Sequence, residues 1–495
     1  MALSLGLDIG SSSIKCAVLD VERGTTLGRG LYPPEEMAIR SPHPGWAEQD
    51  PETWWEHVKT VTKQTFKKYS IDSRAIRSIG ISYQMHGLVL VDANGAVLRP
   101  SIIWCDSRAV DIGNRAFESL GADFCLNHLL NSPGNFTASK LRWVKEHEPD
   151  VFRRISKAML PGDFIAYKLT GEISSTVSGL SEGIFWDFQS NGVSNELLRQ
   201  YEIDPNVLPH LHPTFSKQGT VTKQVAQELG LSEDAVVSYR AGDQPNNALS
   251  LNVLNPGEIA ATAGTSGVVY GVIDEIRYDK LSRVNQFAHV NHSDGRIRLG
   301  VLLCVNGTGI LNSWLRKNVG AGISYNDMNR QAEQAPVGAD GLMVLPFGNG
   351  AERVLENKNI GSRFLGLDFN RHSIAHVFRA SQEGIAFALK YGIDVMNEMG
   401  MHIGVVRAGN SNMFLSPVFR TTFSTISGAR VELYNTDGAE GAARGAAVGN
   451  GACSFEEAFR SLKPVDSIEP DKQLAEPLAN TYHRWLEQLR ATLST

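Results

Sequence analysis

Residues 3–20 read LSLGLDIGSSSIKCAVLD, in which two apolar runs flank a Gly-Ser-Ser-Ser tetrapeptide. Apolar runs of this length are typical of β-strands, and a short polar segment between two of them is typical of a hairpin loop. Residues 257–273 repeat the pattern as GEIAATAGTSGVVYGVI, with Ala-Gly-Thr-Ser-Gly between two β-rich runs. The sequence therefore indicates an internal duplication with one hairpin in each half.

The segments around these hairpins mix helical and strand patterns. Helices are expected at 52–68 and 139–146, and short apolar strands at 76–82 and 88–91. In the second half, residues 373–399 form a long amphipathic pattern that predicts a helix packed on a second sheet. Both halves are therefore predicted to be α/β.

The length of 495 residues exceeds what one hydrophobic core supports, so two large domains are expected. We place an N-terminal domain at 1–245, with a peripheral subdomain at 191–235 because prolines and Asn-Gly gather there. A C-terminal domain at 246–455 and a tail at 456–495 follow. An amphipathic helix at 482–493 is expected to dock on the body, and a homodimer contact is the alternative.

Composition excludes several classes of protein. The chain carries 47 Lys and Arg against 53 Asp and Glu, so no basic surplus exists for a nucleic-acid partner. Its 5 cysteines are scattered without a CxxC pair, which indicates neither a disulfide framework nor a zinc-cysteine site. The N-terminus lacks a basic segment before its apolar residues, and no apolar run reaches membrane-spanning length. We expect a cytoplasmic protein without a membrane partner.

The first hairpin has the residues that a nucleotide site needs. Asp8 ends the first strand, where its carboxylate can hold magnesium, and small residues follow that let backbone N–H groups approach phosphates. On this interpretation Gly10, Ser11, Ser12 and Lys15 face phosphate. The alternative is a plain turn in which the Asp caps its own backbone.

The second hairpin has the same chemistry, with Gly264, Thr265 and Ser266 at its tip. Two such loops in a duplicated chain favour phosphate binding over two simple turns. The chain contains neither GxxxxGK[ST] nor GxGxxG, so neither a P-loop nor a Rossmann site is indicated.

Two histidine pairs attract attention as candidate metal ligands, His210 with His212 and His289 with His292. Neither pair has a Cys or carboxylate ligand set close by in the sequence. A metal role is therefore not expected for either pair.

Several motifs together carry a resemblance. LDIGSSSIK at 7–15, ATAGTSG at 261–267 and RAGNSNMF at 407–414 resemble the two phosphate segments and the adenosine segment of the actin and hexokinase ATPase superfamily. More closely, the chain resembles the FGGY carbohydrate kinase family from about residue 4 to about residue 455. Further stretches support this in order: GWAEQDPETWW at 45–55, SYQMHGLVLVD at 82–92, IIWCDSR at 102–108, NFTASKLRWVKEH at 135–147, LPGDFIAYKLTGE at 160–172, AGDQPNNAL at 241–249 and SRFLGLDFNRHSIAHVFRASQEG at 362–384.

The resemblance implies two ribonuclease-H-like domains that flank a cleft, with ATP and Mg²⁺ held mostly by the C-terminal domain. In the adenosine segment it assigns Gly409 and Asn410 to the nucleotide. This chain has Arg-Ala-Gly-Asn-Ser-Asn where many members have Gly-Gly-Gly-Ala-Lys-Ser, so its contacts to the nucleoside are expected to differ.

For the sugar, the resemblance points to Gln84-Met85-His86-Gly87, which is similar to the motif of xylulokinases within the family. It implies that Met85 and His86 contact a ketose. From the residues alone, a hydrogen-bonded turn histidine is the favoured interpretation of His86. The residues implied to line the same pocket are Trp104, Asp106 and Arg108.

The resemblance assigns Asp243, in Ala-Gly-Asp-Gln, as the catalytic base that accepts the sugar hydroxyl proton. A helix N-cap before Pro245 is the structural alternative, and the two roles are compatible. Gln244 stands where many xylulokinases carry Asn, and a sugar contact is implied for it.

The implied reaction is ATP-dependent phosphorylation of D-xylulose to D-xylulose 5-phosphate. One alternative is a kinase of the same family that acts on another ketose or polyol. The other is a non-catalytic actin-like ATP switch, which would have no use for sugar-side residues such as Met85, His86 and Trp104.

Overall fold

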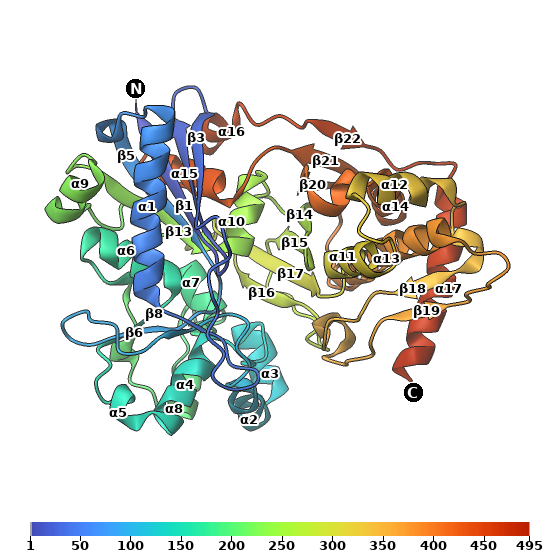
Figure 1. Ribbon diagram of the computed structural model, residues 1–495. Helices are drawn as coiled ribbons and strands as arrows, with labels where there is room; N and C mark the ends of the chain where they lie inside the picture. Colours follow the sequence, from blue (N-terminus) through green and yellow to red (C-terminus); the bar gives the residue numbers. More distant parts are fainter. Residues whose placement is uncertain (1, 495) are drawn as a thin grey trace.

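The computed structural model describes residues 2–494 and shows two lobes side by side (Figure 1). In the first lobe, a five-stranded sheet has the strands β1, β2 and β3 antiparallel, whereas β1, β5 and β13 are parallel. Both expected features, the opening hairpin and the strand near residue 76, are present. From one edge to the other the strands are β3 (Thr25–Tyr32), β2 (Ile14–Asp20), β1 (Leu3–Ile9), β5 (Ile76–Tyr83) and β13 (Val236–Gly242).

The second lobe repeats this arrangement. Its strands β17, β15 and β14 are antiparallel, and β14, β20 and β21 are parallel, with β16 and β22 added at the edges. The duplication and the two ribonuclease-H-like sheets are thereby confirmed. In sheet order the strands are β16 (Asn285–Ala288), β17 (Leu299–Val305), β15 (Gly267–Ile273), β14 (Glu258–Ala263), β20 (Val405–Gly409), β21 (Arg430–Tyr434) and β22 (Asp466–Ile468).

Helix α15 (Gly438–Gly449) links the two halves, because it follows the second-lobe strand β21 yet packs on the first sheet. The contact is so close that a Cβ atom on Gly6 would lie 1.8 Å from the Ala439 carbonyl oxygen. A Cβ atom on Gly80 would lie 1.9 Å from the Ala442 carbonyl oxygen. Only glycine allows this approach, so α15 belongs by packing to the first lobe.

The remainder of the first lobe consists of helices and short strand pairs. Helix α1 (Pro51–Tyr69) packs on β2 and β3, as its amphipathic pattern predicts. The other elements are β4 (Glu48–Gln49) with β7 (Ser101–Ile102), β6 (Val89–Val91) with β8 (Lys157–Met159), β10 (Trp186–Asp187) with β11 (Gly192–Val193), and the helices α2 (Val110–Leu120), α3 (Ala122–Phe124), α4 (Thr137–His147), α5 (Pro149–Phe152), α6 (Pro161–Thr170), α7 (Val177–Glu182) and α10 (Asp243–Ser250).

Residues 191–235, which the sequence assigned to a peripheral subdomain, pack on several parts of the first lobe. Helix α8 (Asn195–Tyr201) packs on α2, and α9 (Lys223–Leu229) packs on α1. Between them, β12 (His210–His212) pairs in parallel with β9 (Ser174–Thr176). The prolines in this segment therefore mark turns between pieces that each dock on a different part of the first lobe.

In the second lobe, α13 (Ile374–Glu398) is the long helix expected at 373–399. The C-terminal helix α17 (Ala475–Leu493) docks on this lobe, where Trp485 is fully buried and donates from Nε1 to the Val344 carbonyl at 2.8 Å. The expected docking of this helix on the body is confirmed. The remaining elements are α11 (Gly309–Asn318), α12 (Tyr325–Gln334), β18 (Met343–Leu345) with β19 (Arg363–Leu365), α14 (Pro417–Ser427) and α16 (Phe455–Phe459).

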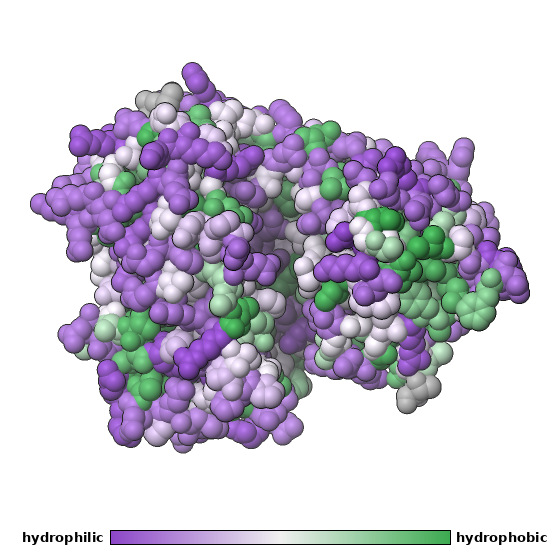
Figure 2. Space-filling model, viewed as in Figure 1, coloured by the Kyte–Doolittle hydropathy of each residue, from purple (hydrophilic) through white to green (hydrophobic). Residues whose placement is uncertain are grey.

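A deep cleft runs between the lobes in the space-filling view (Figure 2). All five cysteines are free thiols. Within residues 2–494, none of the helices has both the length and the apolar composition needed to cross a membrane.

Candidate active site

The cleft contains a cavity of about 260 Å³ between the two sheets, which we call the cleft cavity. Residues from the ends of β1 and β5, from α10, and from the loops after β20 and β21 contribute to its wall. It brings together five residues that the sequence assigned to the site. These are Asp8, Lys15, Asp243, Gln244 and Gly409, and they are joined by Ser82, Asn247, Ser411, Asn412, Thr436, Asp437 and Gly438 among others.

Strand register places the neighbours of Asp8. Asp8 pairs with Lys15 on β2 and with Ser82 on β5, so the three side chains point to one face of the sheet. The Ser82 hydroxyl donates to Asp8 Oδ1 at 2.8 Å, and Lys15 Nζ lies 3.8 Å from Oδ2. The first residue of α15, Gly438, packs directly against this carboxylate, because a Cβ atom at that position would lie only 2.8 Å from Asp8 Oδ2.

Asp243 is the first residue of α10, directly after strand β13. The N-cap of that helix is Gly242, so the expected N-cap role of Asp243 is wrong by one position. Burial raises the pKa of the Asp243 carboxyl to about 7, and the negative charge of Asp8 adds to the effect. A carboxylate that titrates near neutrality is suited to accept a proton from an alcohol during a reaction.

Acidic residues from three segments face the cleft cavity. Asp8, Asp243 and Asp437 all line it. Burial raises the pKa of Asp243 and of Asp437, and the charge of Asp8 adds to the effect in both, after that of Glu440 in the case of Asp437. A divalent cation among them would relieve this repulsion, and carboxylate oxygens are the donors that Mg²⁺ prefers. The residues present therefore fit a magnesium ion.

A second cavity of about 390 Å³ adjoins the first, because Ala263 and Asn412 line both. Gly264 and Thr265 of the second hairpin lie in its wall, whereas Ser266 does not. The Gly309 N–H donates to the Gly264 carbonyl at 3.0 Å, and a Cβ atom on Gly309 would lie 1.9 Å from that oxygen. Residues that sequence reasoning missed complete this cavity: Gly309, Ile310, Asn312, Ser313, Tyr325, Asn326, Asn329, Met413, Leu415 and Ser416.

In the adenosine segment, Asn410 and Asn412 lie in different surroundings. Asn410 lines neither cavity, and its N–H donates to the Tyr434 carbonyl at 2.9 Å, which continues the pairing of β20 with β21. Asn412, with a φ of 53°, turns toward both cavities. Of these two residues, the structure therefore places Asn412, and not Asn410, in the walls of the two cavities.

The tip of the first hairpin is held from outside the cleft. The Gly10 N–H donates within the loop to the Ser13 carbonyl at 3.1 Å, and the carbonyls of Ser11 and Ser12 accept from Gln49 Nε2 at 2.7 Å and the Met37 N–H at 2.8 Å. Gly10, Ser11 and Ser12 are not among the residues that line the cleft cavity.

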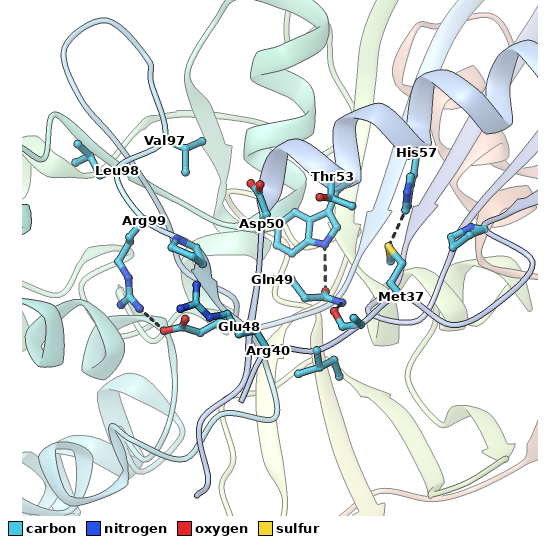
Figure 3. A pocket seen from close by; sticks show the side chains of 15 residues that line it. Met37, Arg40, Glu48, Gln49, Asp50, Thr53, His57, Val97, Leu98 and Arg99 are labelled. Carbon is cyan, nitrogen blue, oxygen red and sulfur yellow. Dashed lines mark hydrogen bonds and ion pairs between the residues drawn. The ribbon is translucent and has the colours of Figure 1, made fainter. Parts of the chain in front are cut away.

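Gln49 lies in the wall of a separate groove of about 610 Å³ (Figure 3). Its Oε1 accepts from Trp54 Nε1 at 3.1 Å, while Met37 Sδ lies 3.2 Å from His57 Nδ1. These contacts fix the segment that supports the first hairpin. Gln49 belongs to the GWAEQDPETWW stretch, so the motif was visible in the sequence but this buttressing role was not.

His86 is fixed in one chemical form. Its φ is 62°, its Nδ1–H donates to the Glu182 carbonyl at 2.9 Å, and its own carbonyl accepts from Lys140 Nζ at 2.9 Å. Burial, followed by the charge of Lys140, lowers the pKa of His86 to about 3. The ring is therefore neutral, and its Nε2 is left as a hydrogen-bond acceptor.

Met85 and Trp104 occupy different places. Met85 is buried beside the residue that precedes Asp243, since a Cβ atom on Gly242 would lie 2.5 Å from Met85 Cγ. Trp104 is 53% exposed, and its Nε1 donates to Ser11 Oγ at 3.3 Å. Trp104 therefore lies against the first hairpin loop and presents an apolar surface to solvent.

Asp106 and Arg108, which the resemblance placed in the sugar pocket, are buried and bound to each other. Asp106 is completely buried, and its carboxylate accepts from Arg108 and from the Ala47 N–H at 2.6 Å. The Arg108 side chain is 1% exposed, pairs also with Glu48 at 2.9 Å, and stacks 3.8 Å from the Trp46 ring. This cluster holds the loops beneath Trp104 together.

Two buried ionisable residues near His86, Lys140 and Glu182, were not singled out from the sequence. Lys140 donates to the carbonyls of His86 and Ile103, both at 2.9 Å, and burial lowers its pKa to about 7. Burial raises the pKa of Glu182 well above its usual value, and the charge of Asp243 adds to this. Lys140 lies in the quoted stretch at 135–147, whereas no sequence pattern pointed to Glu182.

Comparison with known proteins identifies the family. The model of the FGGY family of carbohydrate kinases, N-terminal domain, matches residues 3–250, and that of the C-terminal domain matches residues 259–451. The chain belongs to the FGGY family of carbohydrate kinases. It is an enzyme that phosphorylates a sugar, and kinases of this family use ATP.

Relatives of this FGGY kinase extend along its whole length. It is 30% identical to the xylulose kinase of Staphylococcus xylosus, over 86% of this chain and 87% of that protein. It is 29% identical to the xylulose kinase of Escherichia coli K12, over 98% of this chain and 99% of that protein. A crystal structure of a xylulose kinase from Brucella ovis superimposes with a TM-score of 0.90 at 27% identity and covers 99% of both chains.

Proposed function

We propose that this FGGY kinase phosphorylates D-xylulose to D-xylulose 5-phosphate. The similarity to curated xylulose kinases over almost the whole chain carries the proposal. The position of Met85 supports it, because Met85 follows β5 and lies against Gly242, the residue before the cavity-lining Asp243, and His86 is the next residue in the chain. A kinase for another ketose or polyol is the alternative within the family.

Asp243 is the proposed general base. Its carboxylate takes the proton from the C5 hydroxyl of the sugar as that oxygen forms a bond to the γ-phosphorus of ATP. The bond between the γ-phosphorus and the β,γ-bridging oxygen breaks, and ADP leaves. The raised pKa of Asp243 supports this role, because it brings the proton affinity of the carboxylate near the working pH.

Asp8 and Asp437, which line the same cavity, are proposed to hold the magnesium ion of the nucleotide. Bound there, Mg²⁺ supplies positive charge that offsets the charge on the phosphates. Lys15 places a further cation in the same cavity, and Gly264 and Thr265 bring small residues and backbone close to the neighbouring cavity, where the nucleoside is proposed to bind. Binding between two lobes also excludes water, which would otherwise compete as acceptor.

His86 is proposed to recognise a sugar hydroxyl. Because Nδ1 is committed to the Glu182 carbonyl, Nε2 accepts a hydrogen bond and does not donate one. Lys140 and the Glu182 carbonyl hold the turn in place, and Met85 supplies apolar surface for the carbon chain.

We further propose a sugar-binding N-terminal domain up to residue 245 and a nucleotide-binding C-terminal domain after it. We also propose a cytoplasmic location, which the free cysteine thiols support.

His86→Ala is expected to reduce kcat/KM for D-xylulose about 5- to 150-fold, because a lost hydrogen bond to a buried hydroxyl costs about 1–3 kcal/mol. The KM for ATP should change little, since His86 lines neither the cleft cavity nor the adjoining one. Steady-state kinetics with each substrate varied in turn measures the split. Unchanged D-xylulose kinetics would remove His86 from the sugar site.

The activity is expected to show an acid limb set by Asp243. Below about pH 7 its carboxyl is protonated and cannot accept the hydroxyl proton, so kcat/KM for D-xylulose should fall about tenfold per pH unit. The midpoint of this fall in kcat/KM should move to lower pH as the Mg²⁺ concentration is raised, because the cation offsets the charge of Asp8. A profile that is flat from pH 5 to 8 at low magnesium would contradict the assignment.

A further inference from the structure

Three side chains with metal-ligating atoms meet on the surface of the first lobe, outside the cavities described above. They are Glu172, His210 and His212, and their ligand atoms all lie within 4.8 Å of one another. Glu172 and His210 are exposed, and His212 is half-buried. The cluster is therefore accessible to an ion from solvent.

The fold builds this cluster from two distant segments. His210 and His212 are two residues apart on β12, so their side chains leave the same face of the strand. β12 pairs in parallel with β9, where His210 lies opposite Ser174, and Glu172 precedes Ser174 by two residues. The conclusion from the sequence that this histidine pair lacks a carboxylate is wrong, because the carboxylate arrives through strand pairing.

The spacing of the two imidazoles suits a common metal ion. His210 Nε2 and His212 Nε2 lie 3.2 Å apart, and their ring planes are inclined by 74°. Two imidazole nitrogens at the usual Zn–N distance on a tetrahedral ion are separated by about 3.3 Å. By contrast, His289 is fully buried, and its two ring nitrogens are engaged by the Val253 carbonyl and the Tyr270 hydroxyl, both at 3.0 Å.

We propose that Glu172, His210 and His212 form a binding site for a divalent transition metal, of which Zn²⁺ is the representative. Two imidazoles and one carboxylate are a ligand set that leaves a fourth tetrahedral position for water. Mg²⁺ is a poor occupant, because it prefers oxygen ligands in an octahedral shell. This site is therefore separate in chemistry and in place from the magnesium site of the cleft.

Metal at this site ties β12 to the segment that leads into β9. Strand β9 continues directly into α7, whose last residue is Glu182, and the Glu182 carbonyl holds the ring of His86. An ion that binds only the folded protein raises its stability, and the gain grows with the logarithm of the ion concentration once that exceeds the Kd. Metal binding at this site is thus expected to stabilise the folded first lobe and to have no part in the phosphoryl transfer.

The test uses chelator-treated protein without a polyhistidine tag, because such a tag binds zinc itself. Titration with ZnCl₂ in a calorimeter, without nucleotide and with millimolar Mg²⁺ present, should show one Zn²⁺ per chain and a rise in Tm. Co²⁺ should give the visible absorption of a tetrahedral site. The double variant His210→Ala, His212→Ala should lose the Zn²⁺ binding, the rise in Tm and the Co²⁺ absorption, and Glu172→Gln should weaken all three.

His483→Ala is the matched control, because His483 is an exposed histidine on α17 in the other lobe. It should bind Zn²⁺ as the unaltered protein does. Kinase turnover of the double variant should be retained, which shows that it is folded. The absence of stoichiometric binding in the unaltered protein, or full binding in the double variant, would overturn the proposal.

Discussion

Replacement of Asp243 by asparagine is expected to lower kcat by about 10²- to 10⁴-fold, the usual effect of removing a positioned general base. The amide keeps the size and shape of the side chain but cannot take the hydroxyl proton. Binding of D-xylulose and of the nucleotide, measured by calorimetry, should be retained, because Asp243→Asn removes a negative charge from a buried position without removing a side chain.

Asp234→Asn is a suitable control for that variant. Asp234 precedes β13, its side chain is 90% exposed, and its contact with Arg77 at 3.9 Å is weak. Its kinetics should match those of the unaltered protein. Near-normal turnover of Asp243→Asn would reduce Asp243 to a structural residue at the start of α10.

The second large effect is expected for Asp8→Ala. This change removes the carboxylate to which Ser82 donates and beside which Lys15 lies. Charge stabilisation by a bound metal supplies several kcal/mol to phosphoryl transfer, so turnover should fall by roughly 10³-fold or more, with sugar binding still measurable.

The replacement Asp8→Ala is also expected to change the pKa of Asp243. Because the charge of Asp8 raises the pKa of Asp243, the pKa of Asp243 should fall in this variant. The residual activity should consequently show its acid limb at lower pH than the unaltered enzyme does. Normal turnover of Asp8→Ala at saturating magnesium would exclude Asp8 from the mechanism.

Local patterns in the sequence predicted the elements well. The two hairpins, the long helix near residue 373 and the docked C-terminal helix all follow from periodicity, because each buries one regular face. The strand order was accessible only through the duplication and the family resemblance. The return of α15 to the first sheet was not predicted, since only the close approach to Gly6 and Gly80 reveals it.

In the candidate site, too, local motifs identified some residues, whereas the placement of others depends on the tertiary structure. Asp8, Lys15, Asp243 and Gly409 were found because motifs carry them, and the cavity brings them together. Asp106 comes from a motif as well, but it lies outside the cavity because its side chain is buried against Arg108.

Residues that act through burial or through distant pairing left no local signal. Glu182 acquires its raised pKa only when the chain folds around it. Glu172 likewise joins His210 and His212 only through the pairing of β9 with β12. Such contacts depend on tertiary structure, which periodicity and motif spacing do not encode.

The central claim concerns the acceptor sugar, and a coupled assay of ADP release across a panel of acceptors tests it most directly. The panel contains D-xylulose, D-ribulose, L-ribulose, D-fructose, glycerol and gluconate at equal MgATP. A site built around the neutral acceptor of His86 penalises an analogue that lacks the matching hydroxyl, so D-xylulose should give the highest kcat/KM. A higher kcat/KM for any other member of the panel would contradict the D-xylulose assignment.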